Sequence, residues 1–316
     1  MTDTRDELLA ALAAADDPVP GPTLAEQLSV SRAAVWNHVE ALREAGFGVE
    51  SGPEGYRLRT VPTFGGRALA LGLDAPYEVE FHESLASTND RARELAADGA
   101  AEVVVVAERQ TGGRGRLDRE WTAPPGGVYA STVLRPDRPP AHVPAFTLAA
   151  AVATTRACRE AGVDARIKWP NDVVVPDADA ERGGRKLAGI LTEMEGEADR
   201  VSWLVVGVGV NADVEAASLP AGATSLADEA GDVDRRAFTQ RLLESFHDLT
   251  ADLDAVLPAW REHALTLGRR VRVETPGGII EGDAVDVTFP GALVVATDDG
   301  REVVHAGDCE HLRPAE

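Results

Sequence analysis

The order of predicted strands and helices between residues 77 and 266 constrains the fold more than any other feature. The strands do not alternate regularly with helices, and two long apolar strands, at residues 186–194 and 202–210, are separated only by the short turn 195–200. A parallel connection needs a dozen or more residues, so strands this close in sequence form an antiparallel hairpin. The pattern therefore favours an α+β domain over a doubly wound sheet.

Further elements are predicted in the same region from apolar runs and helical spacing. The other strands are expected at residues 78–82, 102–107, 128–134, 165–168 and 173–175, and the helices at 88–97, 145–161, 235–253 and 258–265. Beyond them, short strands separated by glycine and proline turns are predicted at residues 271–274, 279–287, 292–296 and 303–305. This spacing is typical of a small β-barrel.

The first 60 residues read as a separate module. Helices are predicted at residues 6–15, 23–28 and 32–45, and a hairpin at 49–59 turns at Gly52-Pro53-Glu54-Gly55. Thr23 and Ser31 are the expected N-caps, because a hydroxyl before a helix accepts a bond from its first free N–H groups. Three helices followed by a hairpin predict a winged helix-turn-helix. We therefore expect domains at 1–60, 61–266 and 267–316, with a linker over 61–72.

The chain is strongly acidic, with 53 Asp and Glu against 31 Lys and Arg and a net charge of −22. Such a surface repels nucleic acid at low salt and keeps a protein soluble in high salt, so a halophilic source is our hypothesis. No apolar run reaches the length of a membrane span, which predicts a cytoplasmic protein. The two cysteines have no metal-site or disulfide spacing, and no histidine pattern or GxSxG motif predicts zinc or serine chemistry.

Lysine is nearly absent: 29 of the 31 basic residues are arginine, and the two lysines, Lys168 and Lys186, lie within nineteen residues of each other. Chance or a salt bridge is one explanation. The other is that an ammonium point charge is required there, which a guanidinium does not replace.

Residues 108–121 (ERQTGGRGRLDREW) follow an apolar strand and hold four arginines within 109–119 against one acid. Gly112, Gly113 and Gly115 let the backbone approach a ligand, and Arg114 and Arg116 have the geometry to bind phosphate or carboxylate. The segment is not a Walker A loop. It is either an anion-binding loop or a flexible basic surface loop.

Three other segments combine polar groups with tight spacing. They are KWPND at residues 168–172 with RKLAGILTE at 185–193, SLASTN at 84–89, and VGVGVN at 206–211. Each has a purely structural alternative: Asp172 in a turn or salt bridge, Ser87 or Thr88 as a helix cap, and Gly207 and Gly209 as points of close backbone approach.

Taken in order, these motifs resemble the biotin–protein ligase family, specifically the bifunctional ligases that are also biotin-operon repressors. The resemblance covers nearly the whole chain and rests on residues 87–89, 110, 113–116, 121, 168–172, 185–191 and 209–211. It implies a class II synthetase-like central domain with a mixed or antiparallel sheet, and an SH3-like C-terminal barrel. Lipoate ligases share the fold but are not expected to carry this set of motifs.

The resemblance implies two reactions. Biotin and ATP, with Mg²⁺, form biotinyl-5′-adenylate, and the biotinyl group then passes to a lysine of a biotin carboxyl carrier protein. The implied catalytic residues are Lys186, Arg116, Asp172 and Lys168. The implied biotin-binding residues are Ser87, Thr88, Asn89, Gln110, Gly113, Arg114, Gly115, Arg116, Lys186 and Gly189. The implied adenylate-binding residues are Arg114, Arg116, Arg119, Trp121, Asn171, Lys186 and Asn211, and no residue is assigned to a metal.

Within this scheme Lys186 would hold the biotin carboxylate and α-phosphate, and Asp172 would orient or deprotonate the acceptor lysine. Trp121 would stack beside the adenine or close the loop over it, and Asn211 would contact the purine. Ser87, Thr88 and Gln110 would bind the ureido ring.

Repressor members bind operator DNA through a helix resembling residues 31–42. The expected DNA-contacting residues are Ser31, Arg32, Asn37, His38 and Arg57. Residues 1–60 carry five arginines against ten acids, however, and this charge opposes phosphate contact unless salt screens it. A module kept for structure or protein contact is the alternative.

Two other functions remain open from the sequence: a transcription factor that only senses a small ligand, and a lipoate or octanoyl ligase. Lys186, Arg116 and Asp172 argue against a pure sensor, because a sensor need not keep a group for the acceptor lysine. Family repressors pair through the central sheet, so a homodimer is also an expectation.

Overall fold

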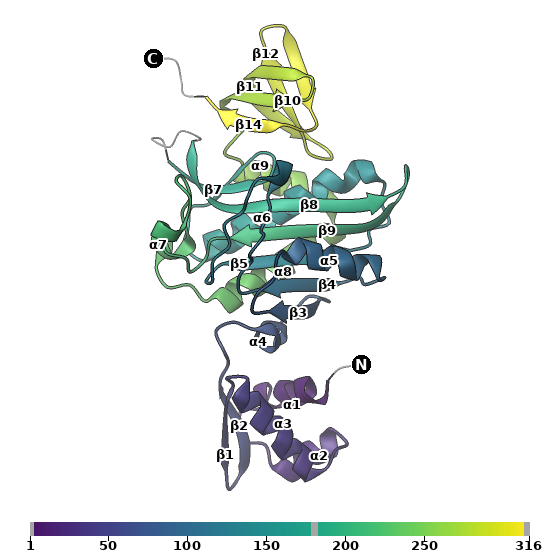
Figure 1. Ribbon diagram of the computed structural model, residues 1–316, viewed down its shortest axis with the longest axis vertical. Coiled ribbons are helices and arrows are strands. Elements are labelled where there is room, and N and C mark those ends of the chain that lie inside the picture. Colours follow the sequence, from purple (N-terminus) through teal and green to yellow (C-terminus); the bar gives the residue numbers. More distant parts are fainter. Residues whose placement is uncertain (1–2, 178–182, 313–316) are drawn as a thin grey trace. The chain divides into compact units, whose positions relative to one another are not determined.

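A computed structural model describes residues 3–177 and 183–312 (Figure 1). The chain divides into two compact units, Met1–Asp74 and Ala75–Glu316. The finer division at residues 61 and 267 stays a prediction. None of the described helices is both long and apolar enough to cross a membrane.

The first unit contains three helices, a hairpin and a further short helix. They are α1 (Thr4–Ala13), α2 (Gly21–Gln27), α3 (Arg32–Glu44), β1 (Gly48–Gly52), β2 (Gly55–Thr60) and α4 (Gly66–Ala70). The antiparallel hairpin β1–β2 follows α3 directly, as predicted. Ser31 caps α3 by accepting a bond from the Ala34 N–H at 3.1 Å, which confirms the expected N-cap.

Two expectations for this unit are wrong. Thr23 does not cap α2, because the helix begins at Gly21 with Pro20 as N-cap and Pro22 in its first turn. Proline presets the helical φ and needs no N–H there, so it extends the helix toward the N-terminus. The predicted linker also contains α4, whose Ala68 and Leu69 are buried. Apolar burial therefore orders part of a segment that glycine and proline marked as a connection.

A seven-stranded mixed sheet forms the centre of the second unit, in the order β3-β4-β5-β9-β8-β7-β6. Its strands are β3 (Glu78–His82), β4 (Val103–Ala107), β5 (Val128–Leu134), β6 (Arg166–Lys168), β7 (Asp172–Pro176), β8 (Gly184–Gly196) and β9 (Val201–Val210). Only β3 and β4 pair in parallel, and β8 and β9 form the predicted antiparallel hairpin. All seven predicted strands are present, so the α+β class is confirmed.

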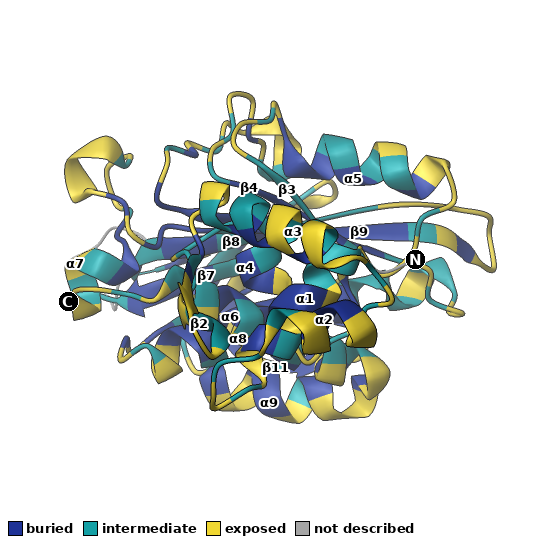
Figure 2. Cartoon of the chain, turned by 90° about the horizontal axis from the view of Figure 1, so that it is seen from below, coloured by how far each residue is buried: buried dark blue, intermediate teal, exposed yellow. Residues whose placement is uncertain are grey.

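Helices cover both faces of this sheet. Figure 2 shows α5 above the strands and α6, α8 and α9 below them, each with buried and exposed bands. The bounds are α5 (Thr88–Ala97), α6 (Val143–Glu160), α7 (Leu226–Ala230), α8 (Arg235–Ala251) and α9 (Val256–His263). Short 3₁₀ turns lie at Arg116–Asp118, Pro140–His142, Ala216–Ser218 and Leu253–Ala255. Helix α7 was not predicted, because five residues are too few to show helical periodicity.

A five-stranded antiparallel sheet ends the chain, in the order β13-β12-β11-β10-β14. Its strands are β10 (Arg270–Thr275), β11 (Gly278–Thr288), β12 (Ala292–Thr297), β13 (Gly300–Val304) and β14 (Asp308–His311). The sequence analysis missed β14, which pairs with β10. The indole N–H of buried Trp169 donates to the Gly291 carbonyl at 2.9 Å, so this sheet and the central sheet are joined beside KWPND.

His311 provides a pH test of this packing. Its ring is buried with Nε2 3.1 Å from the Thr266 hydroxyl, and burial lowers the pKa of His311 to about 3. The unfolded chain, with an ordinary histidine pKa of ~6.5, binds the proton more readily, so stability falls as pH drops below that value. We expect wild type to lose ~1.4 kcal/mol more than His311→Gln between pH 7.5 and 5.5. Denaturant titration in high salt measures this, and an equal loss in the variant would contradict the assignment.

Candidate active site and candidate nucleic-acid interface

A cavity of about 780 Å³ lies beside β8, β9, the N-terminal end of α5 and residues 108–121, which we call the glycine–arginine segment. It brings together nearly all of the side chains singled out from the sequence. The lining includes Ser87, Thr88, Asn89, Gln110, Arg114, Gly115, Arg116, Arg119, Trp121, Lys168, Asn171, Asp172, Lys186, Gly189 and Asn211. Gly113 is not among the lining residues. A Cβ there would lie 2.6 Å from the Trp121 carbonyl oxygen, so its role is to permit close backbone approach.

A β-bulge places Lys186 in the cavity. Asp172 pairs with Gly189 and Val173 with Ala188, but Val174 pairs with Lys186, so Leu187 is an extra residue on β8. Residues three apart on a regular strand point to opposite faces, and one extra residue restores Lys186 to the face of Gly189. There its Nζ lies 2.7 Å from Asp172 Oδ1.

Trp121 packs across two glycines that face each other on β8 and β9. Gly189 pairs with Gly209, and a Cβ on either would lie 3.1 Å and 2.8 Å, respectively, from the Trp121 indole. The ring also lies beneath the Lys186 ammonium, with 5.3 Å between Nζ and the ring centroid. Among the residues that the structure describes, the buried Trp121 indole N–H finds no hydrogen-bond partner. These two glycines therefore admit a flat aromatic group beside the cation.

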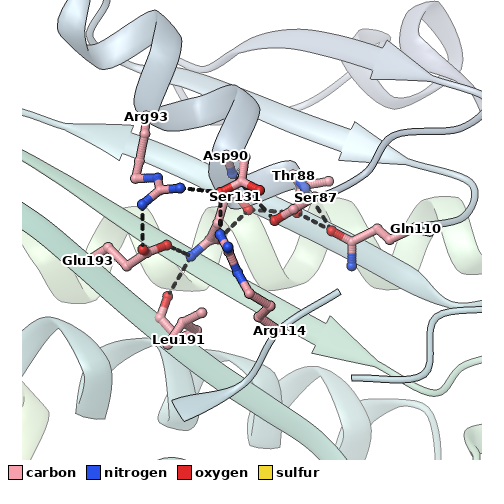
Figure 3. Close-up of polar contacts among 10 residues, drawn as sticks. Ser87, Thr88, Asp90, Arg93, Gln110, Arg114, Ser131, Leu191 and Glu193 are labelled. Atoms are coloured by element: carbon pink, nitrogen blue, oxygen red, sulfur yellow. Dashed lines mark hydrogen bonds and ion pairs between the residues drawn. The ribbon is translucent and has the colours of Figure 1, made fainter. Parts of the chain in front are cut away.

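One wall of the cavity, formed by residues 87–89 and Gln110 and called here the neutral end, carries uncharged hydrogen-bonding side chains (Figure 3). Gln110 Oε1 accepts from the Thr88 backbone N–H at 2.7 Å and from its hydroxyl at 3.0 Å. The buried Ser131 hydroxyl lies 2.7 Å from Thr88 Oγ1 and donates to Asn89 Oδ1 at 2.6 Å. Ser87 caps α5 through a bond from the Asp90 N–H, as its structural alternative predicted. The set suits a neutral, polar ring.

The glycine–arginine segment is a narrow turn held at several points. Trp121 N donates to Gly113 O at 2.9 Å, and Gly115 N to Arg119 O at 2.7 Å. Arg116 donates to Asn171 Oδ1 at 3.1 Å and to the Gly307 carbonyl at 3.0 Å. Burial lowers the pKa of Arg116 from its ordinary value. The segment is therefore ordered against the site rather than being a free basic surface loop.

Two further arginines of this segment are held by carboxylates. Arg119 pairs with Asp308, and this hydrogen bond raises the pKa of Arg119. Arg114 pairs with Asp90 of α5. The C-terminal sheet thus contributes both a carbonyl and a carboxylate to the placement of the segment.

Asn211 joins the end of β9 to the loop at residues 220–224, which lines another side of the cavity. Its Nδ2 donates to the Thr224 carbonyl at 2.9 Å. Lys186 also bonds this loop, its N–H donating to Gly222 O at 2.8 Å and its carbonyl accepting from Thr224 N at 2.9 Å. The loop is therefore fixed to the strand that carries the ammonium.

Several cationic side chains line the cavity. Lys168 is buried with a relative exposure of 5%, and it lines the cavity together with Lys186, Arg116 and Arg119. Within residues 3–177 and 183–312 there is no group of three or more His, Cys, Asp or Glu side chains that could hold a metal ion. These cations suit an anion, and the neutral end suits a polar ring.

Sequence reasoning missed several residues of the site. Ser131, which supports Thr88 and Asn89 from below the cavity lining, is marked in the sequence only as one of two hydroxyl residues within the strand VYASTVL. Residues 220–223 and Asp308 had no local signal, because only the tertiary fold brings them to the cavity, and the same holds for the contact of Gly307 with Arg116.

In the first unit, α3 presents the expected polar face. Arg32 and Asn37 are exposed, and His38 is partly exposed. Trp36, which the sequence analysis did not select, is 55% exposed on the same face. Arg57 instead donates to the Asp16 carbonyl at 2.6 Å and pairs with Asp17 at 3.2 Å, so its guanidinium is already used within the unit.

Three known protein families match separate parts of this chain. A family described as "Biotin/lipoate A/B protein ligase family" matches residues 81–211, "Biotin protein ligase C terminal domain" matches 266–312, and "HTH domain" matches 4–57.

Curated relatives span almost the full length. The chain is 35% identical to "Bifunctional ligase/repressor BirA" of Bacillus subtilis over 94% of this chain and 95% of that one. It is 30% identical to the protein of the same name from Escherichia coli, over 88% of each. A biotin protein ligase from Aquifex aeolicus, solved with biotin and ATP, superposes with a TM-score of 0.61 at 25% identity, covering 75% of this chain and 99% of that one.

Gly207 offers a test of the neutral end. A Cβ on Gly207 would lie 2.0 Å from Asn89 Oδ1, so Gly207→Ala should displace Asn89 and break its bond with Ser131. We expect the free energy of unfolding to fall by ~1–3 kcal/mol. Gly277→Ala is the control, because its nearest atom would be 3.7 Å away. Equal stability of the two variants would contradict the packing described.

Proposed function

The chain belongs to the family of bifunctional biotin ligase/repressors, and from this premise we propose how its cavity performs the ligase reaction. The protein activates biotin with ATP and transfers biotin to a carrier protein. The observation that carries the assignment of residues is the position of Lys186. It lies 2.7 Å from Asp172 and above Trp121, in the same cavity as the neutral end and the other lining cations.

We propose that the neutral end binds the ureido ring of biotin. Thr88, Gln110 and Asn89 line this end with groups that can donate and accept, as a ring with one carbonyl and two N–H groups requires, and buried Ser131 holds Asn89 in place. The valeryl chain would lie along β8 past Gly189, so that its carboxylate reaches Lys186.

In the first step the biotin carboxylate attacks the α-phosphate of ATP, and pyrophosphate leaves. Two anions must approach each other, so the protein supplies positive charge rather than a covalent nucleophile. Lys186 would contact both the carboxylate and the α-phosphate, while Arg116, Arg119 and Lys168 would lie near the phosphates. Trp121 and Asn211 would contact the adenine.

In the second step the amine of the acceptor lysine attacks the adenylate carbonyl, and AMP leaves. The incoming ammonium must first lose a proton. Asp172 would accept this proton after Lys186 has moved from the Asp172 carboxylate to the phosphate. Until then, Lys186 and Asp172 are each other's counter-ions.

Mg²⁺ normally accompanies ATP in this chemistry. The carboxylates Asp172 and Asp308 at the cavity are already in ion pairs, and the described residues offer no three-ligand cluster. The residues present therefore do not fit a protein-held ion. No residue is assigned to Mg²⁺, which would supply further positive charge at the phosphates of ATP.

The first unit we propose to be a winged helix-turn-helix, with β1–β2 as the wing, that binds operator DNA in response to biotin. The exposed face of α3 supports this, because Arg32, Trp36 and Asn37 lie where side chains of a recognition helix reach base edges. The C-terminal sheet we propose to be an SH3-like barrel. A homodimer and a halophilic source remain part of the proposal.

Pyrophosphate exchange tests the ligase assignment. In multimolar salt, wild type should exchange pyrophosphate into ATP with biotin and not with lipoate. Lys186→Ala should lower the exchange rate by ~10²–10³-fold, as removal of a charge-stabilising donor does. Arg301→Ala, which removes an exposed cation of β13, is the control and should retain the rate. Exchange with lipoate alone would indicate the other ligase class, and normal exchange by Lys186→Ala would contradict its role.

A fluorescence anisotropy titration tests DNA binding, using the duplex upstream of the chain's own gene, with biotin and ATP present. Because the unit is acidic and Arg57 is internally paired, few phosphates are neutralised, and the log–log salt slope should be only about −1 to −2. Trp36→Ala should weaken binding by ~10-fold, since apolar base contacts then carry much of the affinity. Absence of biotin-dependent binding in wild type would contradict the repressor role.

A further inference from the structure

Two carboxylates and two arginines form a connected group between α5, β8 and the glycine–arginine segment, and of these four only Arg114 was given a chemical role above (Figure 3). Asp90 pairs with both Arg93 and Arg114. Arg93 also pairs with Glu193 of β8 at 3.1 Å. Glu193 in turn accepts from Asn89 Nδ2 at 2.7 Å, so the group reaches the neutral end of the cavity.

Asp90 lies in the first turn of α5, where the helix dipole and the free N–H groups attract its carboxylate. Its side chain is about one-third exposed, as is that of Arg114. A single exposed ion pair adds only ~0–1 kcal/mol to folding stability. The Asp90 carboxylate, however, is shared by two guanidinium groups and so belongs to a network of ion pairs.

Arg114 therefore has two competing partners. The sequence resemblance assigned Arg114 to the adenylate, but its guanidinium forms an ion pair with the Asp90 carboxylate in the first turn of α5. Arg116 and Arg119 hold the same segment from the other side, through Asn171, Gly307 and Asp308. On the α5 side, the Thr111 and Gly112 N–H groups donate to the carbonyls of residues 85 and 86, and Asp90 adds a side-chain attachment at Arg114.

We propose that Asp90 is a positioning residue that holds the glycine–arginine segment closed through Arg114, so that Arg114 acts by retaining the adenylate rather than by binding its phosphate. This inference rests on the proposed ligase function. It assigns different tasks to two arginines only two residues apart: Arg116 faces the reacting groups, and Arg114 keeps the segment in place.

A double-mutant cycle separates the two roles of Arg114. Asp90→Asn, Arg114→Gln and the double variant are each loaded with biotin and ATP, and release of biotinyl-adenylate is followed by labelling of free lysine-containing peptide in solution. Asp90→Asn and Arg114→Gln should each raise the rate of adenylate release by ~10-fold. This is the effect expected if each variant lowers the equilibrium constant for closing the segment by one order of magnitude. The double variant should release no faster than either single variant, because both changes remove the same contact.

Two variants control for structure. Asp90→Glu keeps the carboxylate and should restore retention at least in part. Glu94→Gln removes a carboxylate of the same helix whose partner is Arg91, and should leave release unchanged. Thermal melting of each variant in the same salt verifies that the fold is retained.

The outcomes are distinct. Multiplicative effects in the double variant, or a faster release in Arg114→Gln with none in Asp90→Asn, would overturn the proposal while leaving the ligase function intact. Failure of the wild type to form any adenylate from biotin would overturn the proposed function and this inference together.

Discussion

The ion pair between Lys186 and Asp172 depends on one irregularity in strand pairing, and the rest of the site is arranged around it. Without the extra residue at Leu187, Lys186 would point to the other face of β8, toward the helices below the sheet. The bulge therefore decides that the ammonium shares a cavity with the arginines. Because the unliganded pair is mutually neutralised, the cavity avoids an uncompensated charge until an anion replaces Asp172.

Small residues give this cation its surroundings. Gly189 and Gly209 leave room for Trp121, and Gly207 leaves room for Asn89, so both ends of the cavity depend on missing side chains in two neighbouring strands. The glycine–arginine segment then closes the cavity from outside. Its arginines contact α5, KWPND and the C-terminal sheet, which makes residues distant in sequence part of one enclosure. In the proposed reaction, such an enclosure would limit the access of water to the biotinyl-adenylate.

Local sequence signals predicted regular elements well and their interruptions poorly. The apolar runs gave all seven central strands, and Ser31 gave the start of α3. Thr23 was wrong as a cap because Pro22 extends α2, and α7 and β14 were too short to produce a period. Arg57 was expected to face DNA, yet its guanidinium bonds Asp16 and Asp17. Partner choice among charged side chains depends on distances in space, which residue spacing does not encode.

The sequence by itself determined which chemical groups belong to the site. They were indicated by the two lysines among 29 arginines, by the glycine–arginine segment and by the order of the polar motifs along the chain. Their arrangement came only from the tertiary structure. The bulge in β8, the buried Ser131 beside Asn89, and the Asp90 and Gly307 contacts of the arginines each join segments tens to nearly two hundred residues apart. The physical reason is that side-chain type sets what a group can do, while strand register and packing set which group it meets.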